Sequence, residues 1–143
     1  MMRIFLDTNI LMDVAESRRF SSEAKNILEL CRHGAFETFA ATLSFATMSY
    51  LLRHQPRESV HALFELLTNV VNVVSVTTEQ FERAMAVGVV RDFEDLMQYQ
   101  CAVDAGCDVI ITNNGEDFLE FSQLPVVSSH DFLLNYFRQQ EGK

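Results

Sequence analysis

Short apolar runs that alternate with helix-like segments constrain the fold of this chain more than any other feature of its sequence. The run at 3–6 is continuous rather than alternating, which is typical of a strand covered on both faces in a parallel sheet. The segment at 21–33 instead repeats its apolar residues at the spacing of one helix face. Repetition of this strand-then-helix order predicts an α/β fold, a three-layer α/β/α sandwich with a mostly parallel central sheet.

The expected strands are short and rich in apolar or β-branched residues, and they cover residues 3–6, 36–42, 70–76, 108–114 and 125–129. The expected helices show apolar residues at helical spacing, and they cover residues 10–15, 21–33, 43–54, 57–68, 78–87, 93–105 and 129–137. Thr8 or Asn9 is expected to cap the first helix, and Ser21 or Ser22 the second. No repeat or internal linker interrupts this order, so a single domain is expected over residues 1–143.

The formal net charge of −9 is unusual for a protein that grips nucleic acid through many phosphates, because such proteins usually carry a basic face. Either nucleic acid is not the ligand, or metal ions neutralise an acidic pocket while a few arginines make the outer contacts. A basic partner protein docking on the acidic surface is a further alternative. No apolar run reaches the roughly 18 residues that span a bilayer, and the N-terminus does not resemble a signal peptide. Three cysteines without metal-ligand spacing are expected to be reduced thiols in a cytoplasmic protein.

Two of the expected strands run into polar and acidic residues, and this pattern indicates a site. The polar residues that follow these strands are Asp7, Thr112, Asn113, Asn114 and Asp117. In an open parallel sheet, ligands bind beyond the carboxyl ends of the strands, so these side chains are expected at one rim. Asp95 starts the helix that leads into the fourth strand, and Gln98, three residues later, shares its helix face.

Three carboxylates at one rim would repel each other strongly without a compensating charge. Hard cations such as Mg²⁺ or Mn²⁺ prefer such oxygen ligands, and they can assist phosphodiester hydrolysis. Asp7, Asp95 and Asp117 are therefore the predicted metal-binding acids. Simpler interpretations exist: Asp95 and Asp117 also suit helix capping. Asp13 suits a solvated acid, and Glu94 is expected to point away from its neighbour, since adjacent helical residues diverge by about 100°.

Three stretches of the chain resemble the motifs of PIN-domain nucleases, namely FLDTNILMD, DLMQYQCA and IITNNGEDF. The resemblance extends over essentially the whole chain, including the order of strands and helices. It implies a ribonuclease site that uses Mg²⁺ or Mn²⁺, an RNA substrate and, often, the toxin half of a bacterial toxin–antitoxin pair of the VapC type. A small antitoxin-like protein is then the expected partner. A homodimer is expected as well, because the family often dimerises and the chain carries 12 Phe residues.

Matched residue by residue, the resemblance gives the catalytic and metal-binding positions to Asp7, Asp95 and Asp117. It gives the support of the first turn and of the polar rim to Thr8, Asn9, Thr112 and Asn114. The arginines that are expected to contact RNA phosphates, if they flank the rim, are Arg18, Arg19 and Arg53. Arg91 is an alternative ion-pair partner for Asp92 or Glu94.

Two positions depart from the family pattern. The family usually carries a glutamate in the helix after the second strand, where this chain has Thr47, and its TxDxDF pattern appears here as TNNGEDF, with Asn114 near the usual first aspartate. Glu94 and Glu116 are nearby acids that are expected to compensate in part. Thr47→Glu should strengthen metal binding if Thr47 faces the pocket, and destabilise the fold if it faces the core. The competing reading is a catalytically weakened or inactive PIN-like module that binds a partner protein or RNA, and divalent-metal binding separates the two readings.

Overall fold

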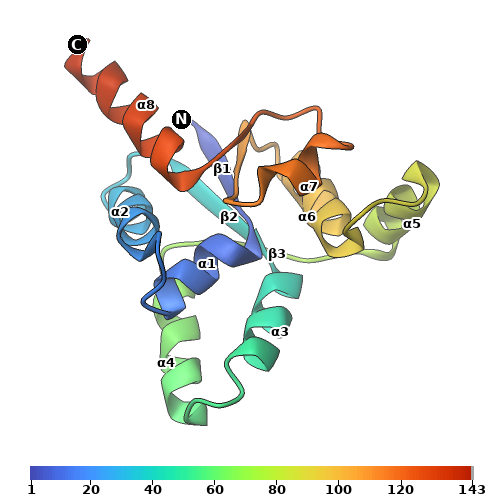
Figure 1. The fold of residues 1–143 in the computed structure, drawn as a ribbon, viewed down its shortest axis with the longest axis horizontal. Helices are drawn as coiled ribbons and strands as arrows, with labels where there is room; N and C mark the ends of the chain where they lie inside the picture. Colours follow the sequence, from blue (N-terminus) through green and yellow to red (C-terminus); the bar gives the residue numbers. More distant parts are fainter. Residues whose placement is uncertain (143) are drawn as a thin grey trace.

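A computed structural model describes residues 1–142 of the chain, and its centre is a five-stranded sheet (Figure 1). The strands are β1 (Arg3–Leu6), β2 (Glu37–Ala41), β3 (Asn72–Val74), β4 (Val109–Ile111) and β5 (Val126–Val127). Every neighbouring pair is parallel, in the order β3-β2-β1-β4-β5. The predicted parallel sheet is confirmed, although the strands predicted at 36–42, 70–76, 108–114 and 125–129 are shorter than expected.

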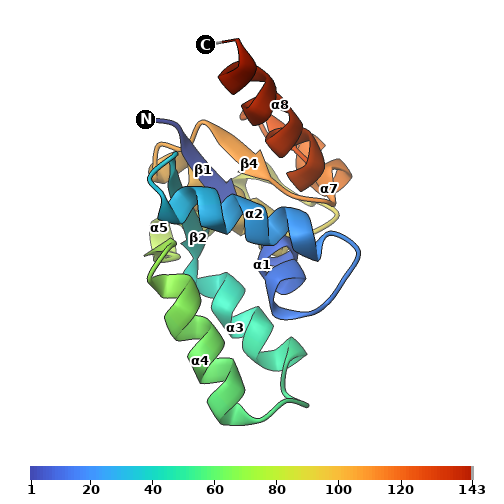
Figure 2. The same ribbon diagram turned by 90° about the vertical axis from the view of Figure 1, so that its left-hand side faces the viewer.

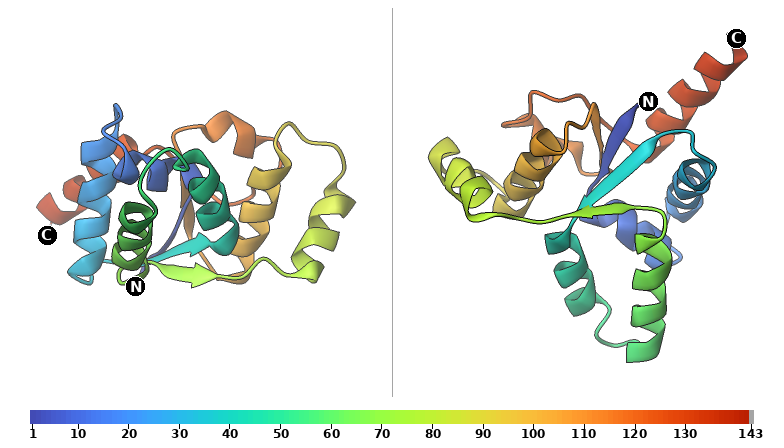
Figure 3. Two further views of the ribbon diagram at one scale, coloured as in Figure 1. Left: turned by 90° about the horizontal axis from the view of Figure 1, so that it is seen from below. Right: turned by 180° about the vertical axis from the view of Figure 1, so that it is seen from behind.

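Eight helices form within residues 1–142 and cover both faces of the sheet. They are α1 (Thr8–Ala15), α2 (Ser21–Arg32), α3 (Thr42–Leu51), α4 (Arg57–Thr68), α5 (Thr78–Val87), α6 (Phe93–Asp104), α7 (Gly115–Leu119) and α8 (Ser129–Glu141). Figure 2 shows α2 lying across one side of the sheet, with α1 beside it. In the views of Figure 3, α3 and α4 extend away from the sheet, while α5 lies outermost beside α6.

Successive side chains of β1 point to opposite faces of the sheet and divide the core in two. Ile4 and Leu6 are fully buried in a cluster with residues of α1, α2, α4 and α8. Phe5 is fully buried in a second cluster, with residues of α6 and α7. The sheet is therefore covered on both faces, which confirms the predicted three-layer sandwich. Among the described residues, no helix combines the length and the apolar character that crossing a membrane requires.

Two predicted helix caps are wrong. The first helix begins at Thr8, before the predicted start, so the residue that caps it is Asp7, whose side chain accepts from the Thr8 backbone N–H. Thr8 and Asn9 lie inside the helix instead. The second helix begins at Ser21, and the residue before it, Phe20, has no side-chain acceptor to offer. Its first turn is therefore held by backbone geometry and tertiary packing rather than by a serine hydroxyl.

The helix α7 was not expected from the sequence, because its five residues are too few to show a helical repeat. Phe118 is fully buried and anchors this helix in the same core cluster as Phe5. The consequence for the site is direct, since α7 carries Asp117 in its first turn.

The strand register brings the ends of β1 and β4 together. Leu6 pairs with Ile111, and the Asp7 backbone N–H donates to the Ile111 carbonyl at 3.1 Å. From β1 the chain adds β2 and β3 on one side of the sheet, and it then adds β4 and β5 on the other. The strand order thus reverses between β1 and β4, which is where open parallel sheets bind their ligands.

Candidate active site

Asp7 lies at the junction of β1 and α1, where both of its carboxylate oxygens are hydrogen-bonded. It is only 4% exposed. Its Oδ1 accepts from the Thr8 backbone N–H at 2.7 Å, and its Oδ2 accepts from the Thr112 hydroxyl at 2.7 Å. The Asn9 side-chain amide and the Asn114 backbone N–H donate to that same hydroxyl, at 3.3 and 3.0 Å. Thr112 therefore fixes Asp7 and ties the end of β1 to the end of β4.

The cap and the first turn of α6 supply two further carboxylates, Asp92 and Asp95. Asp92 caps this helix by accepting from the Asp95 backbone N–H at 3.2 Å, so the capping role considered for Asp95 belongs to Asp92. Asp95 is 7% exposed, and the side-chain amide of Gln98 donates to its Oδ1 at 3.4 Å. The carbonyl oxygen of the same amide accepts from the Thr8 backbone N–H and from the Ser44 hydroxyl, at 3.2 and 3.4 Å. Gln98 thus joins α6 to α1 and to α3.

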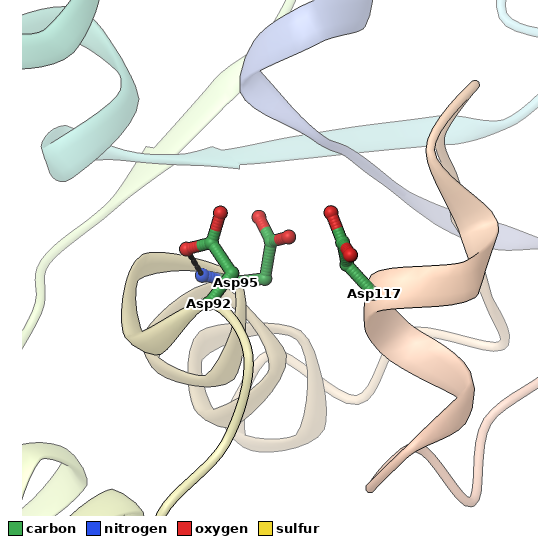
Figure 4. A group of neighbouring side chains, drawn as sticks. All are labelled: Asp92, Asp95 and Asp117. Atoms are coloured by element: carbon green, nitrogen blue, oxygen red, sulfur yellow. Dashed lines mark hydrogen bonds between the residues drawn. The ribbon is translucent and has the colours of Figure 1, made fainter.

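Three carboxylates gather between α6 and α7 (Figure 4). Asp92, Asp95 and Asp117 each offer an oxygen, and these oxygens all lie within 4.8 Å of one another. In Figure 4 the side chains of Asp92 and Asp95 lie next to each other, and Asp117 stands opposite them on α7. Asp7 is not in this tightest group, but it lines the same open pocket of about 180 Å³. The three acids predicted from the sequence therefore share one pocket, together with Asp92 and Glu94.

The pocket also collects most of the predicted accessory residues. Those that line it are Thr8, Asn9, Arg18, Glu94, Gln98 and Asn114. Thr112 does not line it and acts through its hydrogen bond to Asp7. The sequence analysis missed Asp92 as a site residue. The signal was present, because an aspartate three residues before Asp95 has the spacing of a helix cap, and a capping side chain lies beside the first helical turn.

Three predicted site residues lie elsewhere. Glu116 lies next to Asp117 on α7 but borders a separate surface hollow with Val89 and Leu119, because neighbouring helical residues point in different directions. Arg19 stacks its guanidinium 5.0 Å from the centroid of the neighbouring Phe20 ring. Arg53 stacks 4.1 Å from the centroid of the Tyr50 ring and donates to the Tyr50 carbonyl, just past the end of α3. The expectation that Glu116, Arg19 and Arg53 border the acidic pocket is therefore not met.

Other expectations about charged residues are wrong for reasons that only the fold reveals. Asp13 is not a solvated acid: it is 4% exposed, lies 3.4 Å from Arg18, and accepts from the Asn113 side-chain amide at 3.1 Å. Arg91 pairs with Asp117 at 3.4 Å rather than with Asp92 or Glu94, since α7 packs against the start of α6. Glu94, although adjacent to Asp95 in the helix, lines the same pocket.

Burial and mutual repulsion set the protonation of the central acids. Burial raises the pKa of Asp7 to about 6, against the opposing effect of its hydrogen bonds. Burial first, and then the negative charges of Asp7 and the other pocket acids, raise the pKa of Asp95 to about 8. Without a cation, Asp95 therefore keeps a proton at neutral pH. A divalent ion would favour the fully ionised form instead, because it supplies the opposite charge that the pocket lacks.

The donor set suits a hard divalent cation. The tightest group consists of carboxylates alone, without His or Cys, and several more side-chain oxygens line the same pocket. Mg²⁺ and Mn²⁺ prefer such oxygen ligands, whereas zinc sites are usually built with nitrogen and sulfur. The residues of this pocket therefore fit the class of ion that the sequence predicts.

We expect the stability of the metal-free protein to fall as the pH rises from about 4 to about 8. The pKa of Asp95 is raised from its ordinary value of 3.8 to about 8, so the folded chain holds a proton that the unfolded chain has lost. The resulting stabilisation is complete below the ordinary pKa and is lost as the pH rises through the raised one. Thermal unfolding in a chelator across this range should show a steeper decline for wild type than for Asp95→Asn, which cannot titrate.

The control for this experiment is Asp131→Asn, because Asp131 is an exposed acid on α8 outside the pocket. Its decline with pH should follow that of wild type. Equal declines for wild type and Asp95→Asn would contradict the raised pKa of Asp95.

The fold and the pocket together define a class of protein: an all-parallel α/β sandwich with clustered carboxylates at the edge where its strand order reverses. The family model of the PIN domain matches residues 3–116, which is most of the chain. The chain therefore belongs to the PIN-domain family, and the resemblance noted in its sequence motifs is confirmed.

Individual relatives agree with this assignment. Ribonuclease VapC1 of Aquifex aeolicus is 20% identical over 117 residues, which cover 78% of this chain and 81% of the relative. A solved structure of VapC20 from Mycobacterium tuberculosis, described as a sarcin-ricin loop cleaving toxin, has a TM-score of 0.66 and 17% identity, and the match covers 82% of this chain and 95% of that one. A toxin–antitoxin complex from Klebsiella pneumoniae has a TM-score of 0.62 and 23% identity, with 88% and 97% covered. At these identities the solved structures show a common fold.

Proposed function

We propose that this protein is a divalent-metal-dependent endoribonuclease that hydrolyses RNA phosphodiesters. The observation that carries the proposal is the gathering of Asp7, Asp92, Asp95 and Asp117 in one pocket at the reversal of strand order. The name of the relative Ribonuclease VapC1 supports an RNA substrate. Mg²⁺ or Mn²⁺ is the proposed cofactor, because the pocket offers clustered carboxylate oxygens.

In the proposed mechanism the carboxylates of Asp7, Asp95 and Asp117 would hold the metal, and Asp92 would be an additional ligand. Ions of this kind activate water and stabilise the negative charge of a leaving oxygen in phosphodiester hydrolysis. The protein's own contribution is to fix the oxygens in advance. Thr112 holds Asp7 and Gln98 holds Asp95, so the acids do not need to reorganise when the metal binds.

We assign the principal phosphate contact to Arg18. It lines the acidic pocket, whereas the other two arginines considered from the sequence stack on aromatic rings away from it. Buried Asp13 lies 3.4 Å from the Arg18 side chain and restrains it at the edge of the pocket. Arg91, which pairs with Asp117, is the other arginine beside the centre. So few arginines are consistent with a net charge of −9, because the bound ions would offset part of the acidic charge.

We further propose that the chain acts as one PIN-like domain over residues 1–143, in the cytoplasm, as the toxin of a toxin–antitoxin pair. The likeness to a toxin–antitoxin complex from Klebsiella pneumoniae supports a small antitoxin-like partner. The acidic surface favours a basic partner on electrostatic grounds.

Metal binding is the first test, because it separates a nuclease from a module that only binds a partner. Mn²⁺ or Mg²⁺ should raise the melting temperature of wild type, by an amount that corresponds to about 2.7 kcal/mol at a hundredfold excess over the dissociation constant. Asp7→Asn should bind the metal more weakly in calorimetry, since it removes a ligand charge. Glu116→Gln is the matched control, because Glu116 lies outside the pocket and should bind metal like wild type. Equal, weak uptake by wild type and Asp7→Asn would contradict the proposed centre.

Cleavage of RNA is the second test. Purified wild type should cleave total cellular RNA with Mg²⁺ or Mn²⁺, preferentially in single-stranded regions, and a chelator should stop the reaction. Asp95→Asn should lose this activity while it keeps its fold, because the amide has the shape of the carboxylate without its charge. Cleavage by Asp95→Asn at the wild-type rate would mean that the activity arises elsewhere or from a contaminant.

We also propose a homodimer, because exposed apolar side chains remain on α5 and α7, including Phe81, Met85 and Leu119. Light scattering through a dilution series should give twice the mass of the chain at the higher concentrations. The mass of a monomer throughout the series would rule the homodimer out.

A further inference from the structure

Thr47 lies on α3, at the position where the family usually carries a glutamate. Its hydroxyl forms a hydrogen bond with Glu94. The strand β2 delivers the chain to the same edge of the sheet as β1, so α3 begins near the acidic pocket. The Thr47 hydroxyl donates to Oε1 of Glu94 at 2.8 Å. The question whether Thr47 faces the core or the site is therefore answered by a contact between α3 and the first turn of α6.

A short row of hydroxyl groups supports the same carboxylate. The Thr8 hydroxyl reaches Oε1 of Glu94 at 3.5 Å, and it also shares a hydrogen bond of 2.7 Å with the Ser44 hydroxyl. Ser44 is fully buried and lies three residues before Thr47 on α3. Hydroxyl groups from α3 and from the start of α1 thus converge on one oxygen of Glu94.

The other oxygen of Glu94 is left for a ligand. Within residues 1–142, neither a hydrogen bond nor an ion pair engages its Oε2. Glu94 lines the pocket that Asp7, Asp95 and Asp117 also line. A carboxylate with one oxygen fixed by a hydroxyl donor and the other open has the arrangement of a supported metal ligand.

A purely structural role would be simpler. An acid in the first turn of a helix interacts favourably with the helix dipole, and a hydrogen bond to Thr47 would then only join α3 to α6. That role does not require Glu94 to line the pocket beside four other acids. The fold accepts an extra negative charge there, and this cost is understandable if a cation binds to it.

We propose that Glu94 is a further carboxylate ligand of the metal centre and that Thr47 is the residue that positions it. The inference rests on the proposed function, because it concerns the same metal site. Together the two residues replace a carboxylate on α3. Glu94 on α6 supplies the negative charge, and the Thr47 hydroxyl on α3 orients its carboxylate.

The test measures Mn²⁺ affinity by calorimetry on the full chain, together with the melting temperature in a chelator. Glu94→Gln should weaken Mn²⁺ binding about tenfold or more, and Thr47→Val should weaken it by a smaller factor. Thr47→Ser, which restores a hydroxyl, should bind like wild type. In the Glu94→Gln background, Thr47→Val should have no further effect on affinity, because the carboxylate that it positions is gone.

Matched controls separate the site from the fold. Thr42→Val changes an exposed threonine on the same helix, and Glu116→Gln changes an acid outside the pocket, so both should bind Mn²⁺ like wild type. If Thr47→Val and Glu94→Gln lower the melting temperature in the chelator but leave the Mn²⁺ affinity unchanged, the contact is only structural and the inference is wrong.

A relocation experiment provides a second, independent arm. The double variant Thr47→Glu, Glu94→Gln moves the carboxylate from α6 to α3, and its new amide can donate to its new carboxylate across the same contact. It should recover Mn²⁺ affinity relative to Glu94→Gln alone, and failure to recover any affinity in a folded protein would overturn the assignment.

Asp95→Asn distinguishes the failure of this inference from the failure of the metal centre. If wild type takes up no Mn²⁺, or if Asp95→Asn binds it equally well, the proposed function itself is wrong. If Asp95→Asn weakens binding and Glu94→Gln does not, the centre stands and only the role of Glu94 is wrong.

Discussion

The parallel pairing of β1 with β4 is the interaction on which the pocket depends. It places Asp7, which follows β1, beside Thr112, which follows β4. The Thr112 hydroxyl donates a hydrogen bond of 2.7 Å to the Asp7 carboxylate. Both strands end at the reversal of strand order, where no further strand covers the rim and the following segments turn into helices. The helices α6 and α7 then need only present their first turns to this rim to complete the cluster of acids.

The carboxylates in the pocket repel one another, and the rest of the fold must offset this unfavourable free energy. Asp7 and Asp95 are nearly buried, and both have raised pKa values because ionisation there is unfavourable. Gln98 is fully buried between them and α3, and it satisfies its own polar groups while it holds Asp95. Burial of apolar surface in the two hydrophobic clusters, one on each face of the sheet, offsets the unfavourable free energy of these buried acids. A bound cation would offset the same unfavourable charge.

The architecture and the acids that meet in the pocket follow from local sequence patterns, because continuous apolar runs identify parallel strands and residues after those strands must meet at one edge. Contacts between residues that are distant in sequence cannot be predicted from such local patterns. Asp13 is buried because Asn113, remote in sequence, folds back to bond it, and nothing in its neighbours along the chain indicates this. The partner of Arg91 likewise depends on the position of α7, a helix that is too short to recognise from periodicity. Asp92 is different, because its contact with the Asp95 backbone N–H is local and its spacing was visible in the sequence.

The separation of the pocket's parts along the chain has a consequence for the order in which they form. Thr112 lies 105 residues from Asp7, and Asp117 lies later still, so the acids cannot meet while only the first half of the chain exists. Contacts this remote in sequence slow folding more than local contacts do. The intervening chain loses conformational entropy before these contacts can form and stabilise the fold. A nascent chain on the ribosome would thus carry separate acids and no assembled site. Whatever chemistry the pocket performs begins only when synthesis has passed α7.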